Sequence, residues 1–167
     1  MKSNGTGASA KPLPLPDCRG KRVAIVAARF YGELSDWLVD GATRALNDCG
    51  VSAEDIYVYE IPGCFELPLA CRNVIDTERF DAIVAVGVVI RGETPHFDYV
   101  AGECARGIMN VQLATGVPVG FGVLTTDNYA QAEERADPKR GDKGYRAAVA
   151  AATLVTIPAN LPRAGFR

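Results

Sequence analysis

One stretch, from Asp81 to Val100, limits the possible folds of this chain more than any other. It reads DAIVAVGVVIRGETPHFDYV. Its first half, Ala82 to Ile90, is an almost unbroken run of apolar residues rich in Val and Ile, which is typical of a strand buried on both faces of a parallel sheet. The residues that follow, Arg91 to His96, are polar and turn-prone. Open α/β sheets bind ligands at the carboxyl ends of their strands. The stretch therefore predicts a central strand that leads directly into a functional loop.

The end of this loop predicts the start of a helix. Pro95 cannot extend a strand but fits the first turn of a helix, so we expect a helix to begin near His96. This geometry directs backbone N–H groups, the Thr94 hydroxyl and an imidazole toward one small space, which suits a phosphate or a developing oxyanion. His96 is the only histidine in the sequence. Histidine is the usual residue for moving protons near neutral pH, although a single histidine is more often a plain surface or core residue.

The rest of the chain alternates between short apolar runs and segments with helical spacing. Strands are expected at 21–28, 55–61, 82–90 and 118–124, and helices at about 34–49, 66–77, 97–115, 129–136 and 145–157. Ser35 or Asp36 is expected near the start of the first helix, and Thr125 to Asp127 at the start of the fourth. This order predicts an α/β protein, a three-layer α/β/α sandwich with a four-stranded parallel, flavodoxin-like sheet. We expect one domain over residues 21–157, a flexible N-terminal arm over 1–20 and a C-terminal tail over 158–167.

The composition excludes several classes of function. Apolar residues make up 48% and charged residues 23% of the 167 residues, with a formal net charge of −2. This balance gives no reason to expect nucleic acid or a membrane as partner, so an anion site would have to be local. The five cysteines form no CxxC pair, and one histidine cannot complete a zinc set, so no metal is expected. Unpaired thiols and the lack of an apolar export signal predict a cytoplasmic protein.

Four loops at the expected carboxyl ends of the strands carry the candidate binding groups. Phe30 and Phe65 could stack on a flat heteroaromatic ligand, although each taken alone is more simply a packing residue. Glu66 could accept hydrogen bonds from a polyol, or could interact with a helix dipole. Arg135, in the basic segment RADPKRGDK, could clamp a phosphate, or the segment could be a solvated turn. The sequence contains no GxGxxG, GxxxxGK[ST] or HExxH motif, so dinucleotide, NTP and zinc-protease functions lack support.

Several motifs together resemble the lumazine synthase family (6,7-dimethyl-8-ribityllumazine synthase, the β chain of riboflavin synthase). The matching segments run in the family's order and spacing over roughly residues 20–157: ARF from Ala28, IPGCFELPLA from Ile61, VGVVIRGETPHFDYV from Val86, PVGFGVLTTDN from Pro118 and QAEERADPKRGDKG from Gln131. The resemblance implies a transferase of riboflavin biosynthesis that condenses 5-amino-6-(D-ribitylamino)uracil with 3,4-dihydroxy-2-butanone 4-phosphate, releasing phosphate and water. It also implies that no cofactor is needed.

The resemblance further implies a role for each matching residue. Phe30 would stack on the pyrimidine, and His96 would be the catalytic acid and base. Arg135 would grip the phosphate from a neighbouring subunit, so the resemblance implies a homopentamer, with assembly beyond the pentamer left open. The remaining substrate-binding residues would be Cys64, Phe65 and Glu66 at the ribityl chain, Val88, Val89 and Ile90 at the ring edge, Glu93 and Thr94 at the phosphate-bearing substrate, and Phe121 from the neighbour.

Three features depart from the family's usual pattern. The turn from Asp137 to Gly141 differs from the Gly-Thr-Lys-Ala-Gly type that accompanies sixty-subunit capsids in the family, which is why assembly beyond the pentamer is left open. Tyr31 stands where the family often has Asn beside the stacking phenylalanine, which bears on pocket polarity. Cys64 replaces a common Ala, which is a small change. Tyr31 is also the one hint of an alternative function, a flavin- or lumazine-binding protein with little turnover. A third hypothesis is a capsid whose main task is to enclose a partner enzyme.

Overall fold

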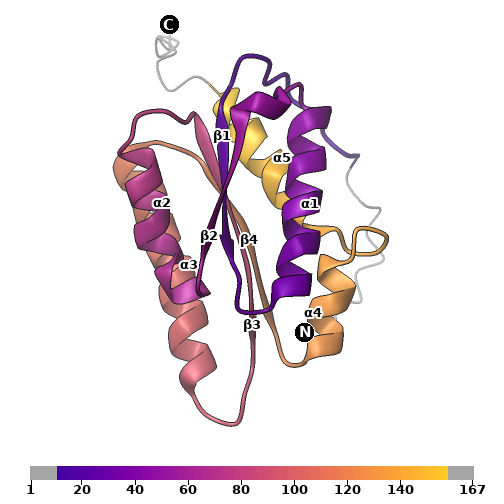
Figure 1. Ribbon diagram of the computed structural model, residues 1–167, viewed down its shortest axis with the longest axis vertical. Coiled ribbons are helices and arrows are strands. Elements are labelled where there is room, and N and C mark those ends of the chain that lie inside the picture. The colour runs from indigo at the N-terminus through magenta and orange to yellow at the C-terminus, as the bar shows by residue number, and fades with distance from the viewer. Residues whose placement is uncertain (1–10, 158–167) are drawn as a thin grey trace, which may run out of the picture.

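The computed structural model describes residues 11–157, which form a parallel sheet with helices on both faces (Figure 1). The strands and helices alternate along the chain, and two short 3-10 turns, Ala53–Asp55 and Cys64–Glu66, precede β2 and α2. Their bounds are β1 Val23–Ala28, α1 Gly32–Asp48, β2 Ile56–Ile61, α2 Leu67–Ile75, β3 Ala82–Ile90, α3 His96–Thr115, β4 Val119–Thr126, α4 Tyr129–Ala136 and α5 Lys143–Val155.

The four strands lie in the order β2-β1-β3-β4, and all neighbouring pairs are parallel. This is the flavodoxin-like order, in which the chain moves outward to β2 and then crosses over β1 to β3. β3, the apolar run Ala82–Ile90, is a central strand, and its first eight residues are all buried. The predicted α/β/α sandwich with a four-stranded parallel sheet is therefore confirmed.

The sheet separates two apolar cores. On one face Val84 and Val86 of β3 pack against α1, α4 and α5, and on the other face Ile83 and Ala85 pack against α2 and α3. Figure 1 shows these two helix layers on either side of the strands. Alternate residues of β3 face opposite layers because successive side chains of a strand point in opposite directions.

Close backbone contacts hold α5 against α1 and β4. A Cβ atom added at Gly144 would lie 2.1 Å from the carbonyl oxygen of Leu38, and one added at Gly120 would lie 2.3 Å from that of Ala147. Only glycine allows backbones to approach this closely. Asp142 precedes α5 in the left-handed region (φ 44°), and Arg44 of α1 donates two hydrogen bonds to its carboxylate, at 2.9 and 3.2 Å. The first turn of α5 is thus fixed in place.

Several element ends differ from the sequence-based expectation. β4 extends to Thr126 rather than ending at 124, because Thr125 and Thr126 pair with the last two residues of β3. The cap of α4 is Asn128, whose side chain accepts the Gln131 N–H at 2.9 Å, so the prediction of a cap within Thr125 to Asp127 is wrong. Ser35 lies buried inside α1, which begins at Gly32.

The structure describes only part of the predicted N-terminal arm and none of the predicted C-terminal tail. Residues 11–22 contain no helix or strand, and Cys18 among them is buried, with its N–H donating to the Cys49 carbonyl at 2.7 Å. Residues 1–10 and the expected C-terminal tail at 158–167 lie outside the described residues.

Candidate active site

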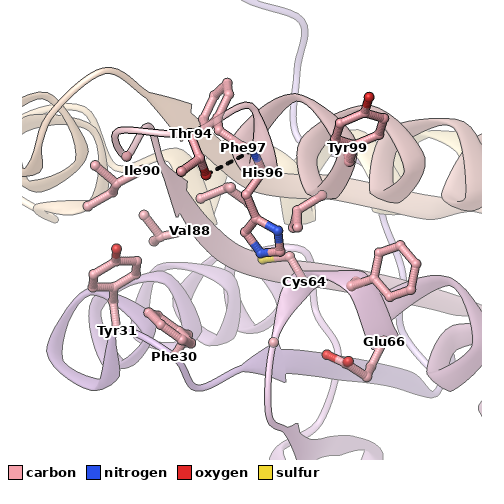
Figure 2. A pocket seen from close by; sticks show the side chains of 15 residues that line it. Phe30, Tyr31, Cys64, Glu66, Val88, Ile90, Thr94, His96, Phe97 and Tyr99 are labelled. Carbon is pink, nitrogen blue, oxygen red and sulfur yellow. Dashed lines mark hydrogen bonds between the residues drawn. The ribbon is translucent and has the colours of Figure 1, made fainter.

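A cavity of about 530 Å³ opens at the carboxyl edge of the sheet, between the loops that follow β1, β2 and β3. We call it the aromatic cavity. Figure 2 shows the His96 imidazole in its middle, with Phe30 and Tyr31 on one side and Glu66 on another. It is lined by Phe30, Tyr31, Gly63, Cys64, Phe65, Glu66, Val88, Val89, Ile90, Gly92, Thr94, His96, Phe97, Tyr99 and Val100.

The loop after β1 supplies an unusually exposed aromatic surface. The Phe30 side chain is 75% exposed although it is large and apolar. The Tyr31 ring packs edge-on against it with 5.0 Å between the ring centroids, and the Tyr129 ring lies 6.4 Å from Tyr31 on the other side. An exposed ring that is fixed from behind by other rings offers a flat stacking surface at little cost in side-chain entropy.

The loop after β3 places His96 at the first position of α3. Its backbone N–H donates to Thr94 Oγ1 at 3.4 Å, so Thr94, Pro95 and His96 form one tight turn at the start of α3. The Arg91 guanidinium lies 4.3 Å from the Phe97 ring centroid, and its nitrogens lie 3.3 Å from carboxylate oxygens of Asp98 and Asp127. Arg91 thereby joins this loop to the start of α3 and to the β4–α4 loop.

The inner wall of the cavity contains a buried thiol. Cys64 is 4% exposed, and a Cβ atom added at Gly87 of β3 would lie 2.6 Å from its sulfur, so Gly87 makes room for it. Burial raises the pKa of the Cys64 thiol to about 12. The thiol is therefore protonated at neutral pH and acts as a packing group and not as a nucleophile.

Of the two acidic residues expected in the site, one lines the aromatic cavity and the other does not. Glu66 lines the cavity, and its carboxylate has no ion-pair partner among residues 11–157, which leaves its oxygens free to accept hydrogen bonds. Glu93 is exposed and lies between two lining residues, Gly92 and Thr94, but does not itself line the cavity.

Phe121 and Arg135 belong to a second hollow, of about 440 Å³, along the outer edge of β4. We call it the cationic hollow. Three cations, Arg135, Lys143 and Arg146, line it together with Phe121, which is 46% exposed. Its remaining lining residues are Gly122, Val123, Leu124, Thr125, Ala147 and Ala150. Within one chain, then, the expected site residues lie at two separate places.

Some lining residues were not singled out by the sequence. Phe97, Tyr99 and Val100 follow His96 on α3, and the spacing of four between His96 and Val100 could have indicated that they share a helix face. Arg146 carried no such signal, because only the packing of α5 beside β4 brings it to Arg135, whereas Lys143 lies in the basic segment RADPKRGDK that the sequence indicated. No helix within the described part of the chain is long and apolar enough to cross a membrane. Residues 11–157 also contain no group of three or more His, Cys, Asp or Glu that could hold a metal ion.

A flavodoxin-like sheet with an aromatic, histidine-containing cavity at its carboxyl edge, and a separate cationic hollow along its β4 edge, is typical of an enzyme for small, flat and anionic molecules. The family model described as 6,7-dimethyl-8-ribityllumazine synthase matches residues 20–159. A protein of Syntrophus aciditrophicus (strain SB), named 6,7-dimethyl-8-ribityllumazine synthase, is 47% identical over 139 residues, which cover 83% of this chain and 90% of that protein. The chain belongs to the 6,7-dimethyl-8-ribityllumazine synthase family. Its activity is that of this transferase, in riboflavin biosynthesis.

Proposed function

We propose that the aromatic cavity of one subunit and the cationic hollow of the next form a single active site. In it, 5-amino-6-(D-ribitylamino)uracil condenses with 3,4-dihydroxy-2-butanone 4-phosphate, and the smallest active form is a homopentamer. The pyrimidine occupies the aromatic cavity, and the phosphate of the second substrate bridges from Thr94 to Arg135 of the neighbouring subunit.

The division of charge between the two surfaces carries this proposal. Among the described residues that line the aromatic cavity there is no Arg or Lys, although one substrate is a phosphate ester. The residues that line the cationic hollow include three cations but no His, Asp or Glu. Each surface supplies what the other lacks, so a ring of head-to-tail subunits would give every subunit one complete site.

The groups in the aromatic cavity match the shape of a ribitylated pyrimidine. Phe30 stacks on the ring, and the backbone groups of Val88, Val89 and Ile90 at the end of β3 bind the polar ring edge. Glu66 accepts hydrogen bonds from ribityl hydroxyls, while Cys64 and Phe65 line the space around that chain. The position of these residues in the cavity supports this assignment.

His96 is the proposed acid and base of the condensation. The amine of the pyrimidine attacks the ketone carbonyl, water leaves to form an imine, inorganic phosphate is eliminated, and ring closure releases a second water. Each of these steps moves a proton, and the imidazole in the middle of the cavity is the side chain suited to move it near neutral pH. Thr94, with Glu93 beside it, holds the phosphate-bearing substrate, and the positive end of α3 favours its negative charge.

Exposed apolar side chains support the assembly of several copies. Leu69 on α2 is 66% exposed, and Met109 and Leu113 on α3 are 52% and 78% exposed. Complete burial of such a side chain from water contributes about 1.5–3 kcal/mol, and an interface would gain the part that corresponds to the exposed fraction. Phe121 of the cationic hollow would be covered in the same way when it meets the neighbour's cavity.

Mixing two variants of greatly reduced activity tests the shared site. His96→Ala damages the aromatic cavity and Arg135→Ala damages the cationic hollow. After subunit exchange, some interfaces join an intact His96 to an intact Arg135, so the mixture should recover a substantial fraction of the activity. Each variant mixed with itself is the control, and analytical ultracentrifugation gives the number of subunits. Confirmed exchange without recovered activity would show that the site is not shared between subunits.

The proposed compartment of this enzyme is the cytoplasm. All five cysteines are unpaired and buried, which suits a reducing compartment. Fractionation of cells followed by the two-substrate assay tests this localisation, and activity confined to a membrane or exported fraction would contradict it.

A further inference from the structure

We propose that Arg146 of α5 is a second phosphate-binding cation of this enzyme, acting beside Arg135 on the same phosphate group. The inference rests on the proposed function, because the cationic hollow is taken to meet the phosphate-bearing substrate. It adds a binding residue on a different helix from the one that carries Arg135.

Most arginines of the described residues are already neutralised by a carboxylate. Arg79, Arg135 and Arg146 are the exceptions within residues 11–157, where every other arginine lies within 4.0 Å of an Asp or Glu oxygen. Arg79 stacks on the rings of Tyr57 and Phe80 at 5.5 and 5.8 Å. The other two arginines line the same hollow. Unpaired guanidinium groups are thus concentrated at one place.

Two carboxylates near the hollow are occupied by other partners. Asp142, at the start of α5, accepts hydrogen bonds from Arg44, and Asp137 accepts one from Arg140 at 2.8 Å. Within residues 11–157, the Arg135 side chain makes only a hydrogen bond to the Gln131 carbonyl, at 2.9 Å. Cations that line one hollow repel each other unless an anion lies between them, so the arrangement indicates an anionic ligand.

The position of Arg146 is set by rigid structure. Its backbone N–H donates to the Asp142 carbonyl at 3.2 Å in the first turn of α5. That turn is held against α1 by the close contact of Gly144 with Leu38 and by the Arg44–Asp142 ion pair. The guanidinium therefore extends from a fixed helix, and only its own side chain must be ordered when the ligand binds.

A phosphate monoester needs more than one cation. Its second pKa is about 6, so it carries close to two negative charges at neutral pH. A single arginine neutralises one of them, while two guanidinium groups can together donate up to four hydrogen bonds to the three terminal oxygens of the phosphate. With Lys143 also at the hollow, Arg135 and Arg146 match a dianion better than a monoanion or a neutral sugar.

Phosphate binding by the assembled enzyme tests the inference. Inorganic phosphate is titrated into wild-type protein and into Arg146→Gln by isothermal calorimetry, and KM is measured for both substrates. We expect phosphate affinity to fall about five- to tenfold and KM for the butanone phosphate to rise by a similar factor, since the arginine is exposed and partly screened. KM for the ribitylaminouracil should stay within about twofold, and Arg146→Lys should recover part of the loss.

Arg79→Gln is the matched control, because it removes the same charge from an unpaired arginine that stacks on Tyr57 of β2, the strand at the opposite edge of the sheet from β4. It should leave phosphate affinity unchanged. An Arg146→Gln enzyme with wild-type phosphate affinity, alongside an Arg135→Ala enzyme that has lost it, would overturn the role of Arg146 and leave the proposed function standing. If Arg146→Gln and Arg135→Ala both keep wild-type phosphate affinity and wild-type KM values, the role of Arg146 and the proposed function are both overturned.

Discussion

The Arg91 guanidinium lies over the Phe97 ring at 4.3 Å from its centroid, across the loop that carries the site. The same guanidinium contacts Asp98 and Asp127, and the Arg91 N–H donates to the Thr126 carbonyl at 2.8 Å. Arg91 thus joins the two ends of the loop from Gly92 to Pro95, and this fixes the start of α3 and the position of His96.

We predict that Arg91→Met lowers kcat about tenfold while the free energy of unfolding changes little, because exposed ion pairs contribute only about 0–1 kcal/mol. Arg91→Lys should recover little, since an ammonium does not stack on a ring as a guanidinium does. Steady-state kinetics and urea unfolding measure the two effects. Arg106→Met, which removes an arginine paired with Glu103 on α3, is the control and should keep wild-type kcat.

His96→Ala should lower kcat by about 10²-fold, which is within the usual range for loss of an acid–base group. Some activity should persist because imine formation from an amine and a ketone proceeds slowly unaided and the cavity still positions the substrates. His96→Gln keeps a polar group of similar size and should be as slow if proton transfer is what matters. Wild-type turnover in either variant would remove His96 from the mechanism.

Tyr31→Leu should raise KM for the ribitylaminouracil about three- to tenfold, because the Phe30 ring would lose the edge-on contact that orients it. Tyr31→Phe keeps the ring and removes only the hydroxyl, so it should bind the pyrimidine as the wild type does. KM for the butanone phosphate should not change in either variant. If the phenylalanine variant is as weak as the leucine variant, the hydroxyl and not the ring is the important group.

The buried thiols predict a loss of stability in alkali. Burial raises the pKa of Cys71 to about 12 and that of Cys104 to about 11, from 9.0. Above pH 9 the unfolded chain loses thiol protons that the folded chain keeps. The contribution of these two thiols to the free energy of unfolding is therefore fully present below pH 9 and is lost as pH rises toward 11–12. The slope is about 1.4 kcal/mol per pH unit for each thiol.

Urea unfolding under reducing conditions at pH 8, 9 and 10 measures this slope. Cys71→Ala should show a shallower decline than the wild type, because lysines and tyrosines titrate equally in both proteins. Identical slopes would show that Cys71 ionises as easily in the folded protein as in the unfolded chain.

Gly144→Ala should destabilise the protein by about 3 kcal/mol, because the added methyl would lie 2.1 Å from the Leu38 carbonyl oxygen and force α5 away from α1. Gly32→Ala is the control. Its methyl would lie 3.7 Å from Arg29, an ordinary contact, and alanine is favoured at the start of a helix, so stability should stay constant or rise slightly. Thermal unfolding of the three proteins measures the difference.

Local sequence patterns were sufficient to predict most strands and helices and the grouping of several residues in the aromatic cavity. The apolar run of β3 and the Pro95 signal lie within short segments, so they predicted a buried strand and a helix that starts near His96. Because the loops after parallel strands meet at the carboxyl edge of the sheet, Phe30, Glu66 and His96 could be grouped in one cavity from the sequence. Spacing along the chain sufficed because each of these residues follows its own strand closely.

Contacts between distant segments depend on the tertiary structure and could not be predicted in this way. β4 reaches Thr126 because β3 offers partners that far, and a local turn signal cannot report on the length of a neighbour. Cys18 is buried in the core beside distant segments, with its N–H donating to the Cys49 carbonyl and its thiol to the Ala152 carbonyl, although its own surroundings in sequence are polar. Arg135 and Arg146 meet at one hollow only because glycines let α5 pack closely on α1 and β4. Local chemistry sets which structure each segment forms, whereas side chains from separate helices come together only through the packing of the whole chain.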